Sequence, residues 1–198
     1  MDTSLNSDYW NNRYANNETT WDVGKVTTPL KKFIETFENK AVQILLPGCG
    51  NAHEVECLLD NGFTNITLID ISELAIYQIK HRFEKAIADN KLKIIWGDFF
   101  LHHGSYDLII EQTFFCAIHP SLRQNYATKM NELLSAKGLL AGVLFNRVFE
   151  KEGPPFGGSE IEYRKLFSYY FEIKKMELCY NSIPQRQGNE LFIILTKG

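Results

Sequence analysis

The feature that most constrains the fold is a glycine-rich turn between a mostly apolar run and a helix-compatible segment, at residues 42–54. An apolar run, then Gly48 and Gly50, then a segment with helical spacing predicts a strand, a tight turn and a helix. Glycine leaves backbone N–H groups open to a ligand where a Cβ would block its approach. The stretch therefore predicts an α/β unit with a ligand site at the turn.

An acidic residue, Asp70, ends a second apolar run about twenty residues further on, the separation typical of nucleotide-binding α/β units. In such units an acid at this place accepts hydrogen bonds from a ribose diol. The dinucleotide fingerprint G-x-G-x-x-G needs a third glycine so that helix and strand pack closely, and that place holds His53. The turn therefore fits S-adenosylmethionine (SAM) better than NAD. The alternative is a turn glycine beside a strand-end aspartate, with no ligand.

Composition is that of an ordinary globular protein. The 198 residues are 44% hydrophobic and 23% charged, which suits one domain over residues 1–198. The formal net charge is −3 and no basic cluster stands out, so nucleic acid is not an expected partner. The chain starts without the features of a signal peptide, and no run reaches membrane-spanning length. We expect a cytoplasmic protein without a membrane anchor.

The spacing of cysteine and histidine argues against a metal site. The four cysteines occur without a C-x-x-C pair, which also disfavours a disulfide framework. His102 and His103 are adjacent, so on an extended chain their side chains point to opposite sides. We expect free thiols, no metal ion and a surface loop at the two histidines.

The first 27 residues form a mostly polar arm that carries four large aromatic side chains, Tyr9, Trp10, Tyr14 and Trp21. Such a segment builds no core of its own, so its aromatics need a surface to cover. One interpretation is that the arm packs on the domain. The other is a cap over the cofactor, where an aromatic face beside a sulfonium cation gains cation–π attraction. The two interpretations are compatible.

Two amphipathic helices are predicted from apolar residues at helical spacing. The first is capped by Thr28 with Pro29 in its first turn, and the second is capped by Ser72. Their apolar stripes are Leu30, Phe33, Ile34 and Phe37 in the first and Ile76, Ile79, Phe83 and Ile87 in the second.

A carboxylate and an aromatic residue, Asp98 and Phe99, follow a third predicted strand at 91–96. They reach the same edge of the sheet as Gly48 and Asp70, where ligands of open α/β sheets bind. The carboxylate can accept a hydrogen bond from an exocyclic amine, and the ring can stack on a purine. Adenine is the group that this pair suits.

A fourth strand, predicted at 106–111, ends in Glu111. Residues from Glu111 onward emerge at the strand end that faces the reacting part of the ligand. Glu111 is thus a candidate polar site residue, and its competing role is that of a simple strand-end acid.

The alternation of strands and helices changes near the end of the chain. A helix that stops at Gly138 precedes a buried strand at 139–145, and Ser159 begins a capping box for a further helix. Two strands within 171–196 are joined by a turn-rich link and form a hairpin. We expect a Rossmann-like α/β fold, with a mostly parallel seven-stranded sheet, a C-terminal antiparallel hairpin strand and helices on both faces.

Motifs along nearly the whole chain occur in the order of a known family. They are Trp10 with Tyr14, Trp21-Asp22-x-Gly24, Leu46-Pro47-Gly48-Cys49-Gly50, Asp70, Gly97-Asp98-Phe99-Phe100, Tyr106-Asp107-Leu108-Ile109, Thr113-Phe114-Phe115-Cys116-Ala117-Ile118 and Glu152-Gly153-Pro154-Pro155-Phe156. The chain thereby resembles the thiopurine S-methyltransferase superfamily, and within it the plant-type halide and thiol methyltransferases called "harmless to ozone layer" proteins.

The resemblance implies a role for each matching residue. Trp10, Tyr14 and Trp21 would line the methionyl and sulfonium side of SAM, and Gly48 would approach the cofactor closely. Asp70 would hold the ribose, and Asp98 and Phe99 would hold the adenine. Gln112 would touch the cofactor, and Tyr163 would line the acceptor pocket. The sequence departs from the family at Tyr14, where plant members carry tryptophan, and at Gln112, where an aromatic residue is expected. Both departures bear on the choice of acceptor.

The activity implied by the resemblance is SAM-dependent methyl transfer to a small molecule. We expect a monomer. The reaction is an in-line displacement, so the enzyme has to align the reactants and exclude water. A soft anion such as thiolate, hydrosulfide, thiocyanate or iodide needs no base, and Glu111 and Tyr163 are the candidates to deprotonate a neutral thiol. The alternatives are a thiopurine-type acceptor and a non-catalytic SAM-binding protein.

Overall fold

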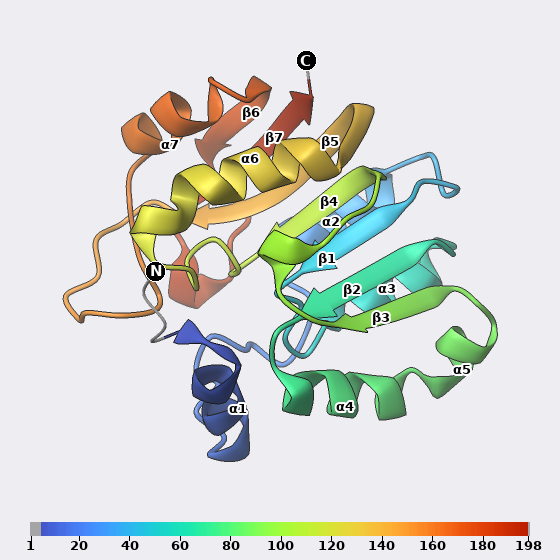
Figure 1. Cartoon of the computed structure of the whole chain (residues 1–198). Coiled ribbons are helices and arrows are strands. Elements are labelled where there is room, and N and C mark those ends of the chain that lie inside the picture. The colour runs from blue at the N-terminus through green and yellow to red at the C-terminus, as the bar shows by residue number, and fades with distance from the viewer. Residues whose placement is uncertain (1–4, 198) are drawn as a thin grey trace.

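The computed structural model describes residues 5–197 (Figure 1). The first four residues, on which part of the expectation about the start of the chain rests, lie outside the described residues. Within residues 5–197, no helix is long and apolar enough to cross a membrane. In the same part of the chain, no group of three or more His, Cys, Asp or Glu side chains is placed to hold a metal ion.

Seven strands form one mixed sheet at the centre of residues 5–197. They are β1 (Ile44–Pro47), β2 (Ile66–Asp70), β3 (Leu92–Trp96), β4 (Tyr106–Gln112), β5 (Leu134–Phe145), β6 (Phe171–Leu178) and β7 (Glu190–Lys197). Their order is β3-β2-β1-β4-β5-β7-β6 (Figure 1). Strands β1 to β5 are parallel, whereas β7 pairs antiparallel with both β5 and β6. The predicted sheet and its C-terminal hairpin are confirmed.

Seven α-helices accompany the sheet in residues 5–197. They are α1 (Ser7–Ala15), α2 (Thr28–Thr36), α3 (His53–Asp60), α4 (Glu73–Arg82), α5 (Glu84–Ala88), α6 (Arg123–Leu133) and α7 (Glu160–Phe167). Ser72 accepts a hydrogen bond from the Ala75 N–H at the start of α4, and Ser159 and Glu162 form the capping box of α7. These two predicted caps are confirmed. The cap predicted at Thr28 is wrong, because Thr28 is already part of α2 and the N-cap is Thr27, whose side chain makes no capping hydrogen bond.

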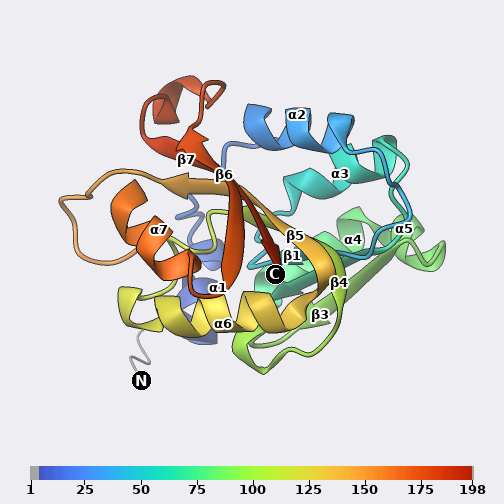
Figure 2. The same ribbon diagram turned by 90° about the horizontal axis from the view of Figure 1, so that it is seen from above.

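Helices cover both faces of the sheet because successive strand residues point to opposite sides and so belong to two cores. Leu45 and Ile109 belong to the core beneath α6 and α7. Ile44 and Ile110 belong to the core beneath α2, α3 and α4. Figure 2 shows α2 and α3 on one side of the sheet and α6 on the other. This layered arrangement confirms the expected fold class.

Several predicted boundaries are wrong, two of them at helix ends. The helix expected to continue through Phe83 to Ile87 breaks at Phe83, so that α4 and α5 are separate helices. Gly138 lies inside β5 and does not end a helix, because Leu134 already pairs with Tyr106 of β4. Pairing with the neighbouring strand outweighs the weakening effect of a glycine inside a strand.

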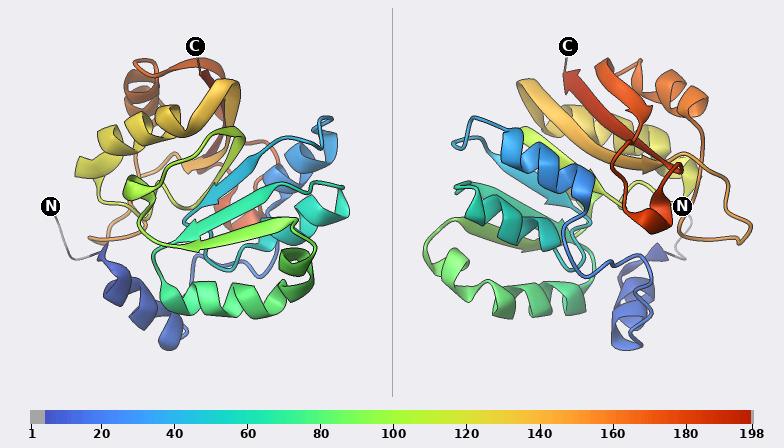
Figure 3. Two further views of the ribbon diagram at one scale, coloured as in Figure 1. Left: turned by 45° about the vertical axis from the view of Figure 1, so that its right-hand side comes forward. Right: turned by 180° about the vertical axis from the view of Figure 1, so that it is seen from behind.

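The N-terminal arm contains a helix that the sequence analysis did not predict. This helix, α1, packs against α4, beyond the helices that cover the sheet (Figure 3). The Ser7 hydroxyl donates to the Ile71 carbonyl oxygen at 2.8 Å, and the Ser72 hydroxyl donates to Asn11 Oδ1 at 2.8 Å. These bonds hold α1 next to the residues that follow β2.

Candidate active site

A cavity of about 580 Å³ lies at the carboxyl ends of β1, β2 and β4. This is the edge at which open α/β sheets bind ligands, and the volume is in the range of small-molecule sites. Every residue predicted to bind the cofactor lines the cavity, namely Trp10, Tyr14, Trp21, Gly48, Asp70, Asp98, Phe99 and Gln112. The fold therefore brings together the predicted residues of the N-terminal arm and those at the ends of four strands.

The glycine-rich loop after β1 binds the carboxylate of Asp70. Gly48 and Gly50 have positive φ angles of 56° and 50°, which glycine adopts without steric cost. The Gly50 N–H donates to Asp70 Oδ2 at 2.9 Å and the Ser72 N–H donates to Oδ1 at 2.8 Å. Burial raises the pKa of the Asp70 carboxyl, although these two N–H groups oppose the rise. Each carboxylate oxygen can accept more than one hydrogen bond, so Asp70 can still accept from a ligand hydroxyl.

Asp98 and Phe99 follow β3 at the same edge of the sheet. The exposed Asp98 accepts a hydrogen bond from the Phe100 N–H at 2.8 Å and thereby caps a short 3-10 turn. Phe99 is 5% exposed, and the centre of its ring is 5.1 Å from that of Phe114. A carboxylate at the rim and a ring in the wall form the pair that suits a purine.

Trp10, Tyr14 and Trp21 form an aromatic wall beside the glycine-rich loop. The Trp21 ring meets Trp10 edge-to-face at 5.6 Å and Tyr14 at 5.9 Å. A Cβ on Gly50 would lie 2.8 Å from the Tyr14 hydroxyl oxygen, so a side chain at position 50 would push the arm away. Burial raises the pKa of Tyr14, which keeps its hydroxyl protonated. All three side chains line the cavity, where an aromatic ring can attract a cation, and the Arg13 guanidinium carbon lies 5.5 Å from the centre of the Trp21 ring.

Asp22 joins the arm to the start of α3. Its carboxylate accepts from the Gly24 N–H at 2.6 Å, from the Asn51 side-chain amide, and pairs with His53 Nε2 at 2.7 Å. Burial raises the pKa of Asp22, but the hydrogen bonds from Asn51, Gly24 and His53 outweigh burial and lower it. His53, at the place of the third fingerprint glycine, therefore makes a contact that glycine lacks. We call Asp22, Asn51 and His53 the arm latch.

A buried arginine, Arg186, also lines the cavity. Phe114, Phe145, Pro154 and Pro155 are apolar residues of the same lining, which also includes the polar side chains of His119 and Asn125. Arg186 is 8% exposed, and its guanidinium carbon lies 5.4 Å from the centre of the Phe145 ring. Its Nη2 donates to the Trp21 carbonyl oxygen at 2.7 Å, and its Nη1 lies 3.4 Å from Glu190 Oε1. A buried cation, paired with a carboxylate, thus lies in the cavity wall.

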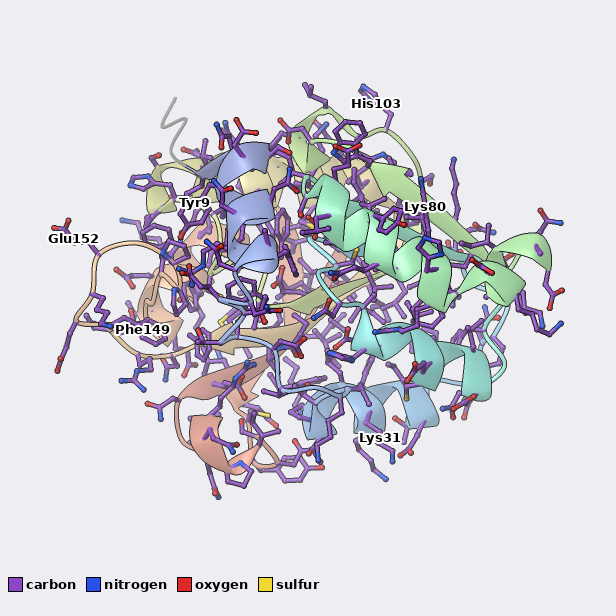
Figure 4. The ribbon with its side chains drawn as sticks, turned by 90° about the horizontal axis from the view of Figure 1, so that it is seen from below. Tyr9, Lys31, Lys80, His103, Phe149 and Glu152 are labelled. Atoms are coloured by element: carbon purple, nitrogen blue, oxygen red, sulfur yellow. The ribbon has the colours of Figure 1, made fainter. Side chains whose placement is uncertain are left out.

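The loop at 146–158 borders this part of the cavity. It is held at its base, because the Gly158 N–H donates to the Arg147 carbonyl oxygen at 2.9 Å and the Phe156 N–H to that of Cys116 at 2.7 Å. Figure 4 shows Phe149 and Glu152 on the part of the loop that projects from the body of the molecule.

Glu111 and Tyr163 do not line the cavity. Glu111 is 0% exposed, and its carboxylate accepts hydrogen bonds from two backbone N–H groups and a tyrosine hydroxyl. Tyr163 is 1% exposed, and its hydroxyl donates to the Phe145 carbonyl oxygen at 2.8 Å. The structure places both predicted catalytic side chains behind the cavity wall, where the protein itself uses their polar atoms.

Two polar groups at the site, the Asp22 carboxylate and the Arg186 guanidinium, are not among the site residues predicted from the sequence. Asp22 belongs to the Trp21-Asp22-x-Gly24 motif, so its position beside an aromatic residue was an available signal. Arg186 lies in the link before β7, where no pattern distinguishes it from a surface residue.

The residues present fit SAM. Asp70 can accept from ribose hydroxyls, Asp98 with Phe99 suits adenine, and the aromatic wall suits a sulfonium. Fold and donor set together define a SAM-dependent methyltransferase.

Solved structures of this class share the fold. Magnesium protoporphyrin IX methyltransferase from Synechocystis, solved with bound SAM, is similar with a TM-score of 0.75 over 100% of this chain and 98% of that one, at 14% identity. The 1,6-didemethyltoxoflavin-N1-methyltransferase of Burkholderia thailandensis, solved with S-adenosylhomocysteine (SAH), has a TM-score of 0.77 over 98% and 88% of the two chains, at 14% identity.

The family model described as thiopurine S-methyltransferase (TPMT) matches residues 5–192, and the chain belongs to this family. Arabidopsis thaliana "Probable thiol methyltransferase 2" is 30% identical over 159 residues, 79% of this chain and 70% of that protein. Thiocyanate methyltransferase 1 of the same plant is 27% identical over 184 residues, 91% and 81% of the two chains. The thiopurine S-methyltransferase of Pseudomonas paraeruginosa is 24% identical over 191 residues, 87% of each. The resemblance noted in the sequence is confirmed.

Proposed function

We propose that the chain transfers the methyl group of SAM to a small, soft anion such as a thiolate, hydrosulfide, thiocyanate or iodide. The observation that carries this proposal is the buried Arg186 beside Phe145 in the cavity wall, to which Phe114, Pro154 and Pro155 also contribute apolar surface. A guanidinium attracts anions, and apolar walls favour those that are weakly hydrated, because they lose least on leaving water. The names of the two plant relatives, thiol and thiocyanate methyltransferase, support the same acceptor class.

The chain's residues divide the work of methyl transfer. Asp70 and Asp98 would hold the ribose and the adenine, and the aromatic wall would surround the sulfonium. When bound, SAM supplies an electrophilic methyl group on a positively charged sulfur. Arg186 retains N–H groups for the acceptor beyond those used on Trp21 and Glu190. An anionic acceptor gives a neutral product without losing a proton, so this role needs no general base.

We also propose that residues 1–27 act as a cap that excludes water from the reaction. In addition to the bond from Ser7 to Ile71, three contacts join the arm to residues around the cavity. These are the arm latch, the Thr27 hydroxyl that donates to Gln112 Oε1 at 3.0 Å, and the Trp21 carbonyl oxygen that accepts from Arg186. Closure of a site strengthens its electrostatic interactions and prevents side reactions with water.

The test is an acceptor screen with SAM as donor, in which SAH is measured by mass spectrometry and volatile methylated products by gas chromatography. We expect hydrosulfide, thiocyanate, iodide and small thiols to react faster than chloride, catechols and carboxylates. Methylation of 6-mercaptopurine alone would favour a thiopurine-type acceptor. Methylation of a catechol or carboxylate, with no thiol or halide product, would overturn the acceptor class.

A further inference from the structure

The buried carboxylate of Glu111 closes the turn that follows β4. Its Oε1 accepts from the Phe114 N–H at 2.8 Å and from the Phe115 N–H at 3.0 Å. Its Oε2 accepts from the Tyr126 hydroxyl at 2.6 Å. Both oxygens are therefore used inside the protein, on two elements that are apart in the sequence.

The backbone of this turn needs such support. Thr113 has a φ angle of 60°, in the left-handed region that a β-branched residue rarely adopts. The two N–H groups that Glu111 holds come directly after Thr113. A side chain that binds both of them favours the unusual conformation over an extended one.

The turn places three consecutive residues, Gln112, Thr113 and Phe114, in the cavity wall. The Phe114 ring fills the space beside Gly48, where a Cβ would lie 2.2 Å from Phe114 Cδ2. The same ring is 5.1 Å from that of Phe99, and Gln112 accepts the hydroxyl of Thr27 in the arm. A shift of the turn would therefore disturb the glycine-rich loop, the adenine side and the arm together.

We propose that Glu111 is a positioning residue, which holds the Thr113 turn so that Phe114 and Gln112 keep their places in the cavity wall. The proposal rests on the methyltransferase function put forward above. Glu111 has no contact with the cavity, so it acts through the turn and does not remove a proton from the acceptor.

The ionisation of Glu111 agrees with this role. Burial raises its pKa to about 7, while the Tyr126 hydroxyl and the two N–H groups oppose the rise. Oε1 accepts the two N–H groups in either protonation state. A glutamine at this place keeps that oxygen and can donate its amide N–H to the Tyr126 oxygen.

The experiment compares Glu111→Gln with Glu111→Ala. Steady-state kinetics give kcat and KM for thiocyanate over a range of pH, and calorimetry gives the Kd of SAH. Amide hydrogen exchange followed by NMR reports the Phe114 and Phe115 N–H groups, with the Ile109 N–H in β4 as the internal reference. Tyr126→Phe removes a single hydrogen bond and serves if Glu111→Ala fails to fold. Tyr106→Phe is its matched control, because Tyr106 is a buried tyrosine whose hydroxyl bonds His102 outside the cavity.

We expect Glu111→Gln to keep kcat/KM within about threefold of the wild type, with both amides protected and the same pH profile. Glu111→Ala should lower kcat/KM at least 30-fold, weaken SAH binding about tenfold, and speed exchange at Phe114 and Phe115 but not at Ile109. Tyr126→Phe should change these values in the same direction, and Tyr106→Phe should not.

Two results would overturn the proposal. One is a Glu111→Gln variant whose kcat falls 100-fold and whose pH profile lacks one ionisation, while its turn amides stay protected. That combination is what loss of a general base would produce. The other is a Glu111→Ala variant with wild-type exchange and wild-type SAH affinity. If the wild type methylates none of the acceptors, the proposed function fails, whereas the exchange and SAH data still decide the role of Glu111.

Discussion

Replacing Asp22 by alanine should loosen the aromatic arm without unfolding the sheet. The Asp22 carboxylate binds three donors, of which Asn51 and His53 belong to the segment after β1. Only 15% of the Asp22 side chain and 22% of the His53 side chain are exposed, so water screens the pair only in part. The variant removes the arm latch, while every strand keeps its neighbours.

The size of the effect on cofactor binding follows from the number of hydrogen bonds that Asp22 makes to Asn51 and His53. A hydrogen bond to a charged group contributes about 1.5–3 kcal/mol, and two such bonds are lost. Part of the loss is offset because water solvates the freed groups and because the contacts of Ser7 and Thr27 remain. We expect cofactor binding to weaken by about 1.5–3 kcal/mol, which is roughly a 10- to 150-fold rise in the Kd of SAH.

Calorimetric titration with SAH measures this Kd, and limited proteolysis reports whether the arm is docked. Asp8→Ala is the matched control, since it removes an exposed carboxylate from the same arm. Asp22→Asn keeps an oxygen for the Gly24 N–H, so its Kd should fall between those of the wild type and Asp22→Ala. Wild-type SAH affinity together with wild-type protease resistance in Asp22→Ala would refute the role of the arm latch.

Three further perturbations test other parts of the site. Asp70→Asn should weaken SAH binding by about 1.5–3 kcal/mol in calorimetry, because a charged acceptor for the ribose is lost. The double variant Arg186→Gln, Glu190→Gln removes the buried cation without stranding its partner, and should raise KM for thiocyanate at least tenfold in the kinetic assay. Burial raises the pKa of Glu111 from 4.5 to about 7, so the folded chain binds more protons between these pH values. The free energy of unfolding in urea should therefore fall on the order of 3 kcal/mol as pH rises through this window, and Glu111→Gln should remove the fall.

The cofactor side of the site could be predicted because it depends on strand ends. Gly48 follows β1 directly, Asp70 is the last residue of β2, and Asp98 comes two residues after β3. Parallel strands of one sheet end at the same edge. The residue types then indicate the ligand. Local pattern and topology agree here, so the sequence is sufficient to predict that these residues lie together at one edge of the sheet.

The acceptor side could not be predicted in the same way, because neighbouring side chains of a strand point to opposite faces. The sequence analysis ended the fourth strand at Glu111, whereas β4 continues to Gln112. Gln112 faces the cavity and Glu111 faces the interior. A difference of one residue at a strand end thus decides whether a side chain lines the cavity or lies in the protein interior.

Tertiary contacts determine two features that could not be predicted from the sequence, helix α1 and the position of Arg186. Helix α1 is short, and its position depends on bonds from Ser7 and Asn11 to residues that follow β2. Arg186 reaches the cavity only because its turn packs beside Phe145 and Trp21. No local periodicity reports such contacts between distant parts of the chain.

The most direct test of the account is a competition among acceptors in one reaction. The wild-type chain is incubated with methyl-deuterated SAM and equal concentrations of thiocyanate, iodide, 6-mercaptopurine and catechol, and mass spectrometry measures SAH and each labelled product. We predict that labelled methyl thiocyanate and methyl iodide together match the SAH formed. Label found only in 6-methylthiopurine or in a catechol ether would contradict the proposal that the cavity selects small, soft anions.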